Sequence, residues 1–136
     1  HADNFEQMED KIPALDQALS ALLADLSSRG LLDSTLVVVA TEFGRSPKIT
    51  PNAGRNHYPK AFSCLLAGGG IRGGQAYGAT DATGAKVIEN SVTAADFNAS
   101  IAFALGLPHD EVVMSPTKRP FRMGGQSGAP ITRIFS

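Results

Sequence analysis

The stretch Thr35-Leu36-Val37-Val38-Val39-Ala40 decides the expected fold of this chain. It is a continuous apolar run rich in β-branched residues, without alternation between apolar and polar positions. A strand that is covered on both faces has no polar face to show to water, so such a run is typical of a buried strand in a parallel sheet. A strand of this kind needs helices on its faces, and the preceding residues supply one.

An amphipathic helix precedes the apolar run. Apolar residues recur at steps of three and four, at Met8, Ile12, Leu15, Leu19, Leu22, Leu23 and Leu26. This spacing places them on one face of a helix whose other face is polar. Pro13 fits the first turn, where no backbone donor is needed, and Gly30 fits the left-handed cap that ends many helices. Helix, short turn and buried strand together form half of an α/β unit.

Further strands are expected after the apolar run. Residues 61–67 predict a second buried strand, which three glycines end. Residues 75–90 predict a hairpin with its turn at 81–84, and the alternating residues 131–135 predict a last short strand. A second helix is expected to begin at Thr93. We therefore expect an α/β fold, a three-layer sandwich with a mostly parallel sheet and a β-hairpin insertion.

The second helix carries clear start and stop signals. Thr93 precedes it and Asp96 occupies the third helical position, an arrangement like a capping box. An apolar stripe follows, and Gly106 and Pro108 end the helix because neither residue continues it well.

Composition limits the classes of protein that this chain can belong to. It has 136 residues, of which 43% are hydrophobic and 18% charged, and its net charge is −1. This content suits a packed core, and the charge balance argues against a nucleic-acid partner for the whole chain. The single cysteine, Cys64, excludes an internal disulfide and a multi-cysteine metal site. No apolar run approaches the roughly 18 residues of a membrane span, so we expect none.

The segment of residues 41–59 is the strongest candidate for a functional site. It leaves the carboxyl end of the apolar run, where α/β sheets place ligands, and it has no clear periodicity. It contains Glu42, Arg45, Arg55 and His57. A carboxylate and an imidazole are ligands for a divalent cation, and a guanidinium suits bidentate capture of phosphate or sulfate. The alternative is an ordinary surface loop in which Glu42 pairs with Arg45 or Arg55.

A glycine-rich segment raises a third possibility, a nucleotide site. The pattern Gly68-x-Gly70-x-x-Gly73 matches the dinucleotide-binding fingerprint and follows a predicted strand. That fingerprint needs a helix directly after its third glycine, because the helix N-terminus holds the pyrophosphate. Residues 74–78 have no helical period, which favours a tight glycine turn instead.

Six segments of the chain together resemble the domain of unknown function 1501 family. They are residues 31–39 (LLDSTLVVV), 41–48 (TEFGRSPK), 54–59 (GRNHYP), 66–74 (LAGGGIRGG), 78–81 (GATD) and 92–97 (VTAADF). The resemblance covers nearly the whole chain, and its Glu-Phe-Gly-Arg and Gly-Arg-x-His segments are fairly specific. The family is placed in the alkaline phosphatase and sulfatase superfamily, and its members are typically bacterial and exported. The resemblance implies that residues 1–136 are the C-terminal part of a single alkaline phosphatase-like domain, in a periplasmic or secreted protein.

The same resemblance implies a metal site. The family usually shows a Trp-Asp-Thr-His-x-x-Asn segment, and His1-Ala2-Asp3-Asn4 is similar to its end. Glu42 stands where the superfamily begins an Asp-His ligand pair, and His57 stands where it has a later histidine. Phe43 takes the place of the second ligand of that pair. We therefore expect Glu42, His57 and His1 to hold a divalent metal (Zn, Ca, Mg or Mn).

The implied function is that of a metal-dependent hydrolase-like protein acting on a small-molecule or glycan ester of phosphate or sulfate. Arg45 and Arg55 are the candidate catalytic residues, because a guanidinium stabilises charge on a transferring group. Thr41 and Asn56 are candidates for positioning ligands. The resemblance places the nucleophile region outside these 136 residues. The alternative is a non-catalytic member that binds glycans or a partner at the bacterial surface, which Phe43 in a ligand position favours.

Overall fold

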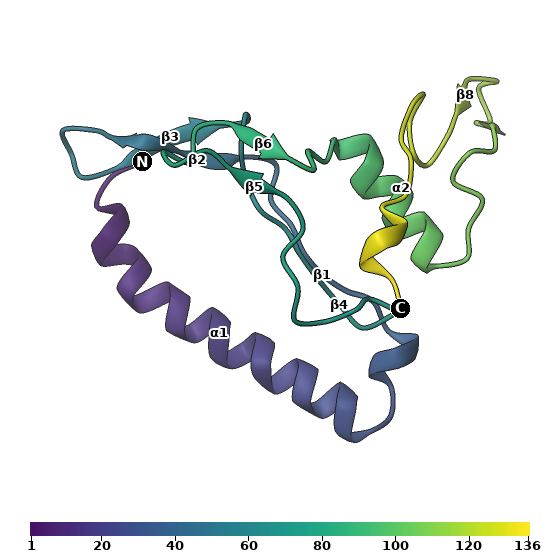
Figure 1. The fold of residues 1–136 in the computed structure, drawn as a ribbon, viewed down its shortest axis with the longest axis horizontal. Coiled ribbons are helices and arrows are strands. Elements are labelled where there is room, and N and C mark those ends of the chain that lie inside the picture. Colours follow the sequence, from purple (N-terminus) through teal and green to yellow (C-terminus); the bar gives the residue numbers. More distant parts are fainter.

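The strands of this protein pair two by two, and every pair is antiparallel (Figure 1). The computed structural model describes residues 1–136. The pairs are β1 (Val37–Val39) with β4 (Leu65–Ala67), β2 (Gly44–Ile49) with β3 (Arg55–Tyr58), β5 (Ala79–Thr80) with β6 (Val87–Glu89), and β7 (Val113–Met114) with β8 (Pro120–Phe121). The expected three-layer sandwich with a mostly parallel sheet is therefore wrong.

The two predicted apolar strands both form, but they run in opposite directions. Val37 lies opposite Ala67 and Val39 lies opposite Leu65. Parallel neighbours need a crossover connection, usually a helix, whereas the residues between β1 and β4 fold into the β2–β3 ribbon. An apolar β-branched run predicts a strand but does not encode the direction of its neighbour. The run is also not buried on both faces, because Val38 is 38% exposed.

The first helix, α1 (Asn4–Ser28), is longer than its apolar stripe predicted. It begins early enough that Pro13 lies inside the helix and not in its first turn, which corrects that expectation. The expected end at Gly30 is confirmed, because this residue has a φ of 67°. The N–H of Leu31 donates to the carbonyl of Leu26 at 2.8 Å, which completes a left-handed C-terminal cap.

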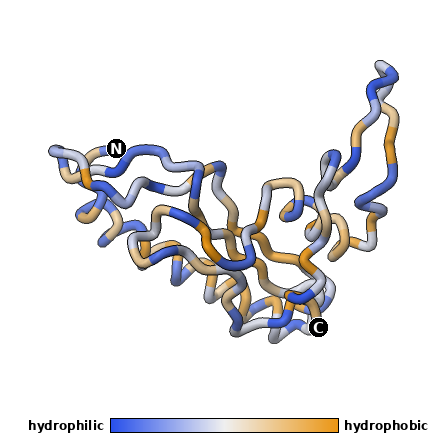
Figure 2. The backbone as a smooth tube through the Cα atoms, turned by 45° about the horizontal axis from the view of Figure 1, so that its top comes forward, coloured by the Kyte–Doolittle hydropathy of each residue, from blue (hydrophilic) through white to orange (hydrophobic).

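The apolar face of α1 does not pack against a sheet. No residue of α1 is buried, and its main contact with another element is with η1 (Leu32–Ser34). Ile12 and Leu15 are each 56% exposed. The chain exposes 9556 Å², against about 6800 Å² for a compact monomer of 14.2 kDa. Figure 2 shows apolar stretches in the middle of the trace. No helix is long and apolar enough to cross a membrane.

The small core lies at α2 (Ala94–Ala104), where the predicted capping box is confirmed. The Thr93 side chain accepts the N–H of Asp96 at 3.1 Å, and the Asp96 carboxylate accepts the N–H of Thr93 at 2.9 Å. The helix ends at Ala104, and the expected stop signal follows it at Gly106, which has a φ of 66°. The buried residues on this helix are Ala99, Ser100 and Ala102.

The C-terminal residues are held on α2 by side chains of the helix. The Asp96 carboxylate accepts the N–H of Ala129 at 3.0 Å, and this bond, followed by those from Thr93, lowers the pKa of Asp96. The buried Ser100 hydroxyl accepts the N–H of Ile131 at 2.9 Å. The residues that follow form the 3-10 turn η2 (Thr132–Ile134), so the strand predicted there is wrong. Ile131 and Ile134 are three residues apart, and residues at this spacing share one side of a 3-10 turn. The apolar pattern that predicted a strand is therefore also compatible with such a turn.

The predicted hairpin in residues 75–90 is confirmed as β5 and β6. The Asp81 carboxylate closes its turn by accepting the N–H of Ala85 at 2.9 Å, the largest cause of its lowered pKa. The Tyr58 hydroxyl donates to the carbonyl of Ala85 at 2.7 Å, which joins this hairpin to the β2–β3 ribbon. No helix follows Gly73, so the glycine-rich segment lacks the helix that the dinucleotide-binding fingerprint requires.

Candidate functional site

The predicted functional loop of residues 41–59 is an ordered ribbon formed by β2 and β3. Arg45 lies opposite His57, and Ile49 lies opposite Arg55, with a bulge between these two pairs. The bulge arises because β2 has more residues than β3 over the same length. The chain turns between the strands at Thr50, whose N–H donates to the carbonyl of Gly54 at 2.9 Å. A segment that appeared irregular in sequence is therefore a scaffold that fixes the spacing of its charged side chains.

The residues before α1 are attached to the tip of this ribbon (Figure 1). The N–H of Asp3 donates to the carbonyl of Asn52 at 3.0 Å, and the N–H of Asn4 donates to the carbonyl of Ala53 at 3.0 Å. Gly54 is buried directly beneath His1, and a Cβ built there would collide with the His1 carbonyl. The absence of a side chain at Gly54 therefore permits the backbone of His1 to lie against the ribbon.

Two of the three predicted metal ligands come together here. The ring centroids of His1 and His57 are 4.5 Å apart, with an interplanar angle of 37°. The ring of Phe43 stacks on the ring of His57 at 3.9 Å between centroids. Three rings from distant parts of the sequence thus form one cluster, and all three side chains remain at least partly accessible to solvent.

The third predicted ligand, Glu42, is exposed and does not join this cluster in the structure. No group of three or more His, Cys, Asp or Glu side chains is placed to hold a metal ion. Glu42 also pairs with neither Arg45 nor Arg55, because the only ion pair joins Arg29 to Asp25 on α1. The alternative in which Glu42 neutralises an arginine of this segment is therefore wrong.

The two candidate catalytic arginines cross the ribbon in opposite directions. Arg45 donates to the carbonyl of Arg55 at 3.2 Å, and its guanidinium carbon is 5.8 Å from the centroid of the Phe43 ring. Arg55 donates to the carbonyls of Ser46 at 2.9 Å and Pro47 at 3.2 Å. A guanidinium has five N–H donors, so both arginines keep donors for an anion while backbone carbonyls hold them in place.

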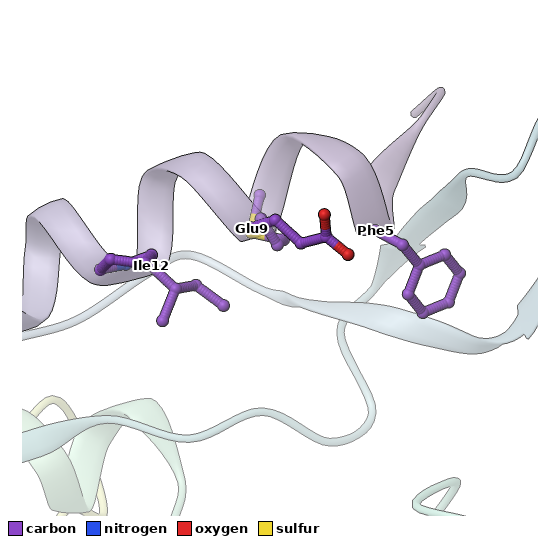
Figure 3. A pocket seen from close by; sticks show the side chains of 5 residues that line it. Phe5, Glu9 and Ile12 are labelled. Atoms are coloured by element: carbon purple, nitrogen blue, oxygen red, sulfur yellow. The ribbon is translucent and has the colours of Figure 1, made fainter.

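A shallow hollow on α1 lies near the same joint. It encloses about 370 Å³ and is lined by Phe5, Met8, Glu9, Ile12 and Pro13. Figure 3 shows Phe5, Glu9 and Ile12 on the same side of the helix. The guanidinium of Arg55 lies 5.5 Å from the centroid of the Phe5 ring, a cation–π distance. This contact adds a second link between the helix and the ribbon.

Sequence reasoning missed two residues that build the site. Phe43 was considered only as a missing ligand, whereas in the structure it stacks on His57. Gly54 was included only as part of a family segment, whereas it makes room for His1. The glycine in the turn between two strands was a signal that could have been used, because such glycines often mark a close approach of backbones.

The residues present fit part of a divalent-metal coordination sphere. Zinc sites in proteins commonly use three or four ligands, and the His1 and His57 imidazoles would supply two of them. The fold and the cluster thus define a small chain of helices and antiparallel strand pairs. One ribbon carries Arg45, Arg55 and His57, and His1 lies against it.

The chain belongs to the family described as "Protein of unknown function (DUF1501)", which matches residues 1–135. No curated protein and no solved structure matches it. The family membership expected from the sequence segments is confirmed.

Proposed function

We propose that this chain is part of an exported, metal-dependent, hydrolase-like protein of the alkaline phosphatase and sulfatase superfamily, which acts on phosphate or sulfate esters. The observation that carries the proposal is the meeting of His1 and His57, whose ring centroids are 4.5 Å apart, next to Arg45. An imidazole pair beside an unpaired guanidinium combines the donors for a divalent cation with a donor for an oxyanion.

Each side chain has a distinct role in this proposal. His1 and His57 would hold the divalent metal, and a bound metal supplies Lewis-acid polarisation of an ester oxygen. Arg45 and Arg55 bind the remaining oxygens of the phosphate or sulfate group. Both guanidinium groups are already fixed by backbone carbonyls, so little ordering remains to be done when the anion binds. Phe43 restricts the rotation of the His57 ring by stacking on it.

Metal titration of the whole chain tests this proposal. Calorimetry with Zn²⁺ and Mn²⁺ is expected to show one site per chain, weakened at least tenfold in His57→Ala and in His1→Ala. His109→Ala is the matched control, because His109 is the remaining histidine and is not part of the cluster. Equal affinity in all four proteins would contradict the assignment of His1 and His57 as ligands.

A second candidate is a non-catalytic member that binds a glycan or a partner. The observation in its favour is the aromatic stack, because Phe43 occupies one face of His57 at 3.9 Å. A partly exposed aromatic ring next to an arginine is a common feature of binding surfaces. The two candidates differ in one measurable respect. The non-catalytic candidate binds its ligand equally well with and without a chelator, whereas the hydrolase-like candidate loses ester binding when metal is removed.

A further inference from the structure

The β7–β8 hairpin forms an arm that projects away from the rest of the molecule (Figure 1). The arm, residues 112–123, comprises both strands and the turn between them. Its strands contact mainly each other, and every residue of the arm except Ser115 is exposed. A hairpin of two strands is at best marginally stable in water when no other surface packs against it. The arm is therefore expected to need a partner.

One face of the arm is apolar and uncovered. Val113 lies opposite Phe121 across the two strands, so the two side chains stand on the same face of the hairpin. Phe121 is 50% exposed, and Val113 and Met123 are nearly as accessible to solvent. Removal of these side chains from water would favour the binding of a partner.

The charged side chains of the arm are all basic. They are Lys118, Arg119 and Arg122, and no Asp or Glu occurs between residues 112 and 123. All three cations are exposed, and none of them forms an ion pair within the chain. An apolar face beside unpaired cations fits a partner surface that is both apolar and acidic.

The first half of α1 has this complementary character. Glu6, Glu9 and Asp16 lie at helical spacings of three and seven residues, so these carboxylates form an acidic line along one side of the helix. All three are exposed, and none forms an ion pair. The shallow hollow of about 370 Å³ on α1 is mostly apolar and shares Glu9 with this line, beside Phe5 and Ile12 (Figure 3).

The arm cannot reach the hollow of its own chain. The start of α1 lies near one end of the longest axis of the molecule and the arm lies at the other end (Figure 1). The chain also exposes about 2700 Å² more than a compact monomer of its mass. A stable interface buries about 1200–2000 Å² counted over both partners, so this surplus is large enough for one copy to contact another.

We propose that the arm of one copy of this chain docks on the first half of α1 in a second copy. The apolar face at Val113 and Phe121 covers the hollow, and the cations of the arm meet the acidic line. Because each copy has one arm and one hollow, two copies can exchange arms and form a closed symmetric pair. The hollow ends at Pro13, so Leu15 stays outside the contact.

Exchange of charge between two variants tests this contact. Sedimentation of the whole chain, with a chelator present so that no metal bridges two copies, is expected to show a mass that rises with protein concentration. Added salt is expected to weaken this association. Arg119→Glu alone and Glu9→Lys alone are each expected to weaken it about tenfold, because each brings like charges together. An equimolar mixture of the two variants is expected to regain the wild-type association, because each arm in a mixed pair meets a helix of opposite charge.

The β5–β6 hairpin supplies matched controls. Lys86→Glu and Glu89→Lys reverse charges of the same sign at exposed residues and are expected to leave the association unchanged. Phe121→Ala is expected to weaken the association, whereas Ile88→Ala, at a side chain that is 62% exposed, is expected not to do so. Circular dichroism of every variant is expected to match the wild type, because all the replaced side chains are exposed.

Three results would overturn the proposal: a chain that stays monomeric at every concentration, a mixture that does not regain association, or equal effects of Arg119→Glu and Lys86→Glu. Vesicles of phosphatidylglycerol test the competing occupant of the arm, an anionic membrane surface. A chain that stays monomeric and binds these vesicles through Arg119 would assign the arm to the membrane and not to a second copy.

Discussion

The joint between His1 and the ribbon depends on the missing side chain of Gly54, so Gly54→Ala is the sharpest perturbation that this structure offers. The new Cβ would collide with the His1 carbonyl, and the backbone on one side must move. The backbone dihedrals of Gly54 are not in the left-handed region, so the effect is steric rather than a conformational cost of alanine. The substitution is expected to displace the His1 segment from the ribbon.

The size of the effect follows from the bonds that this displacement breaks. The N–H groups of Asp3 and Asn4 donate to the ribbon at 3.0 Å each, and a net contribution of about 0.5–1.5 kcal/mol per bond gives about 1–3 kcal/mol in total. That free energy corresponds to a roughly 5- to 150-fold smaller docked population relative to the undocked one. Zinc affinity is expected to fall towards that of a site with His57 alone, because only the docked state brings His1 and His57 together.

Two measurements check this prediction. Nuclear Overhauser contacts between the rings of His1 and His57 are expected in the wild-type chain and are expected to disappear in Gly54→Ala. Calorimetry with Zn²⁺ is expected to show the weaker binding. Gly73→Ala is the matched control, because a Cβ there meets no atom within 4 Å and the φ of Gly73 is not positive. Retention of the ring contacts in Gly54→Ala would refute the steric argument.

Three further predictions concern the scaffold. Ser100→Ala removes the acceptor of the Ile131 N–H, and leaving this buried donor unpaired is expected to lower the free energy of unfolding by about 1–3 kcal/mol in urea denaturation. Asp96 and Asp81 have pKa values below the ordinary 3.8, so the stability that they contribute is present above about pH 4 and is lost as the pH falls through their folded-state values. The urea concentration at the unfolding midpoint is therefore expected to decrease as the pH is lowered below about 4. This decrease is expected to be less steep in Asp96→Asn than in the wild type. Leu15→Gln is expected to change the free energy of unfolding by no more than about 0.5 kcal/mol, because Leu15 is 56% exposed and its helix packs on no sheet.

Each of these predictions has an outcome that contradicts it. An unchanged urea midpoint in Ser100→Ala would mean that water replaces the lost acceptor. A pH dependence of Asp96→Asn identical to that of the wild type would mean that this carboxylate does not fasten the C-terminal residues. A loss of several kcal/mol in Leu15→Gln would show that the apolar face of α1 is covered in solution.

Local elements were predictable because their causes lie within a few residues. The Thr93–Asp96 capping box, the glycine at position 30 and the turn at Asp81 all depend on side chain to backbone bonds or on backbone dihedrals near the residue itself. The antiparallel pairing of β1 with β4 was not predictable in this way. Its strand direction depends on how the residues between β1 and β4 fold, and those residues were expected to form an irregular loop.

The sequence by itself determined the family, the end of the first helix, both ends of the second helix to within a few residues, and the types of side chain available for a metal or an anion. Only the tertiary structure decided which of those side chains meet. His1 reaches His57 because Gly54 leaves room for its backbone, while Glu42 remains exposed and the cations of the ribbon remain without carboxylate partners. The physical reason is that residue types and local bonds are encoded over short distances, whereas the approach of two distant segments depends on steric fit between their backbones.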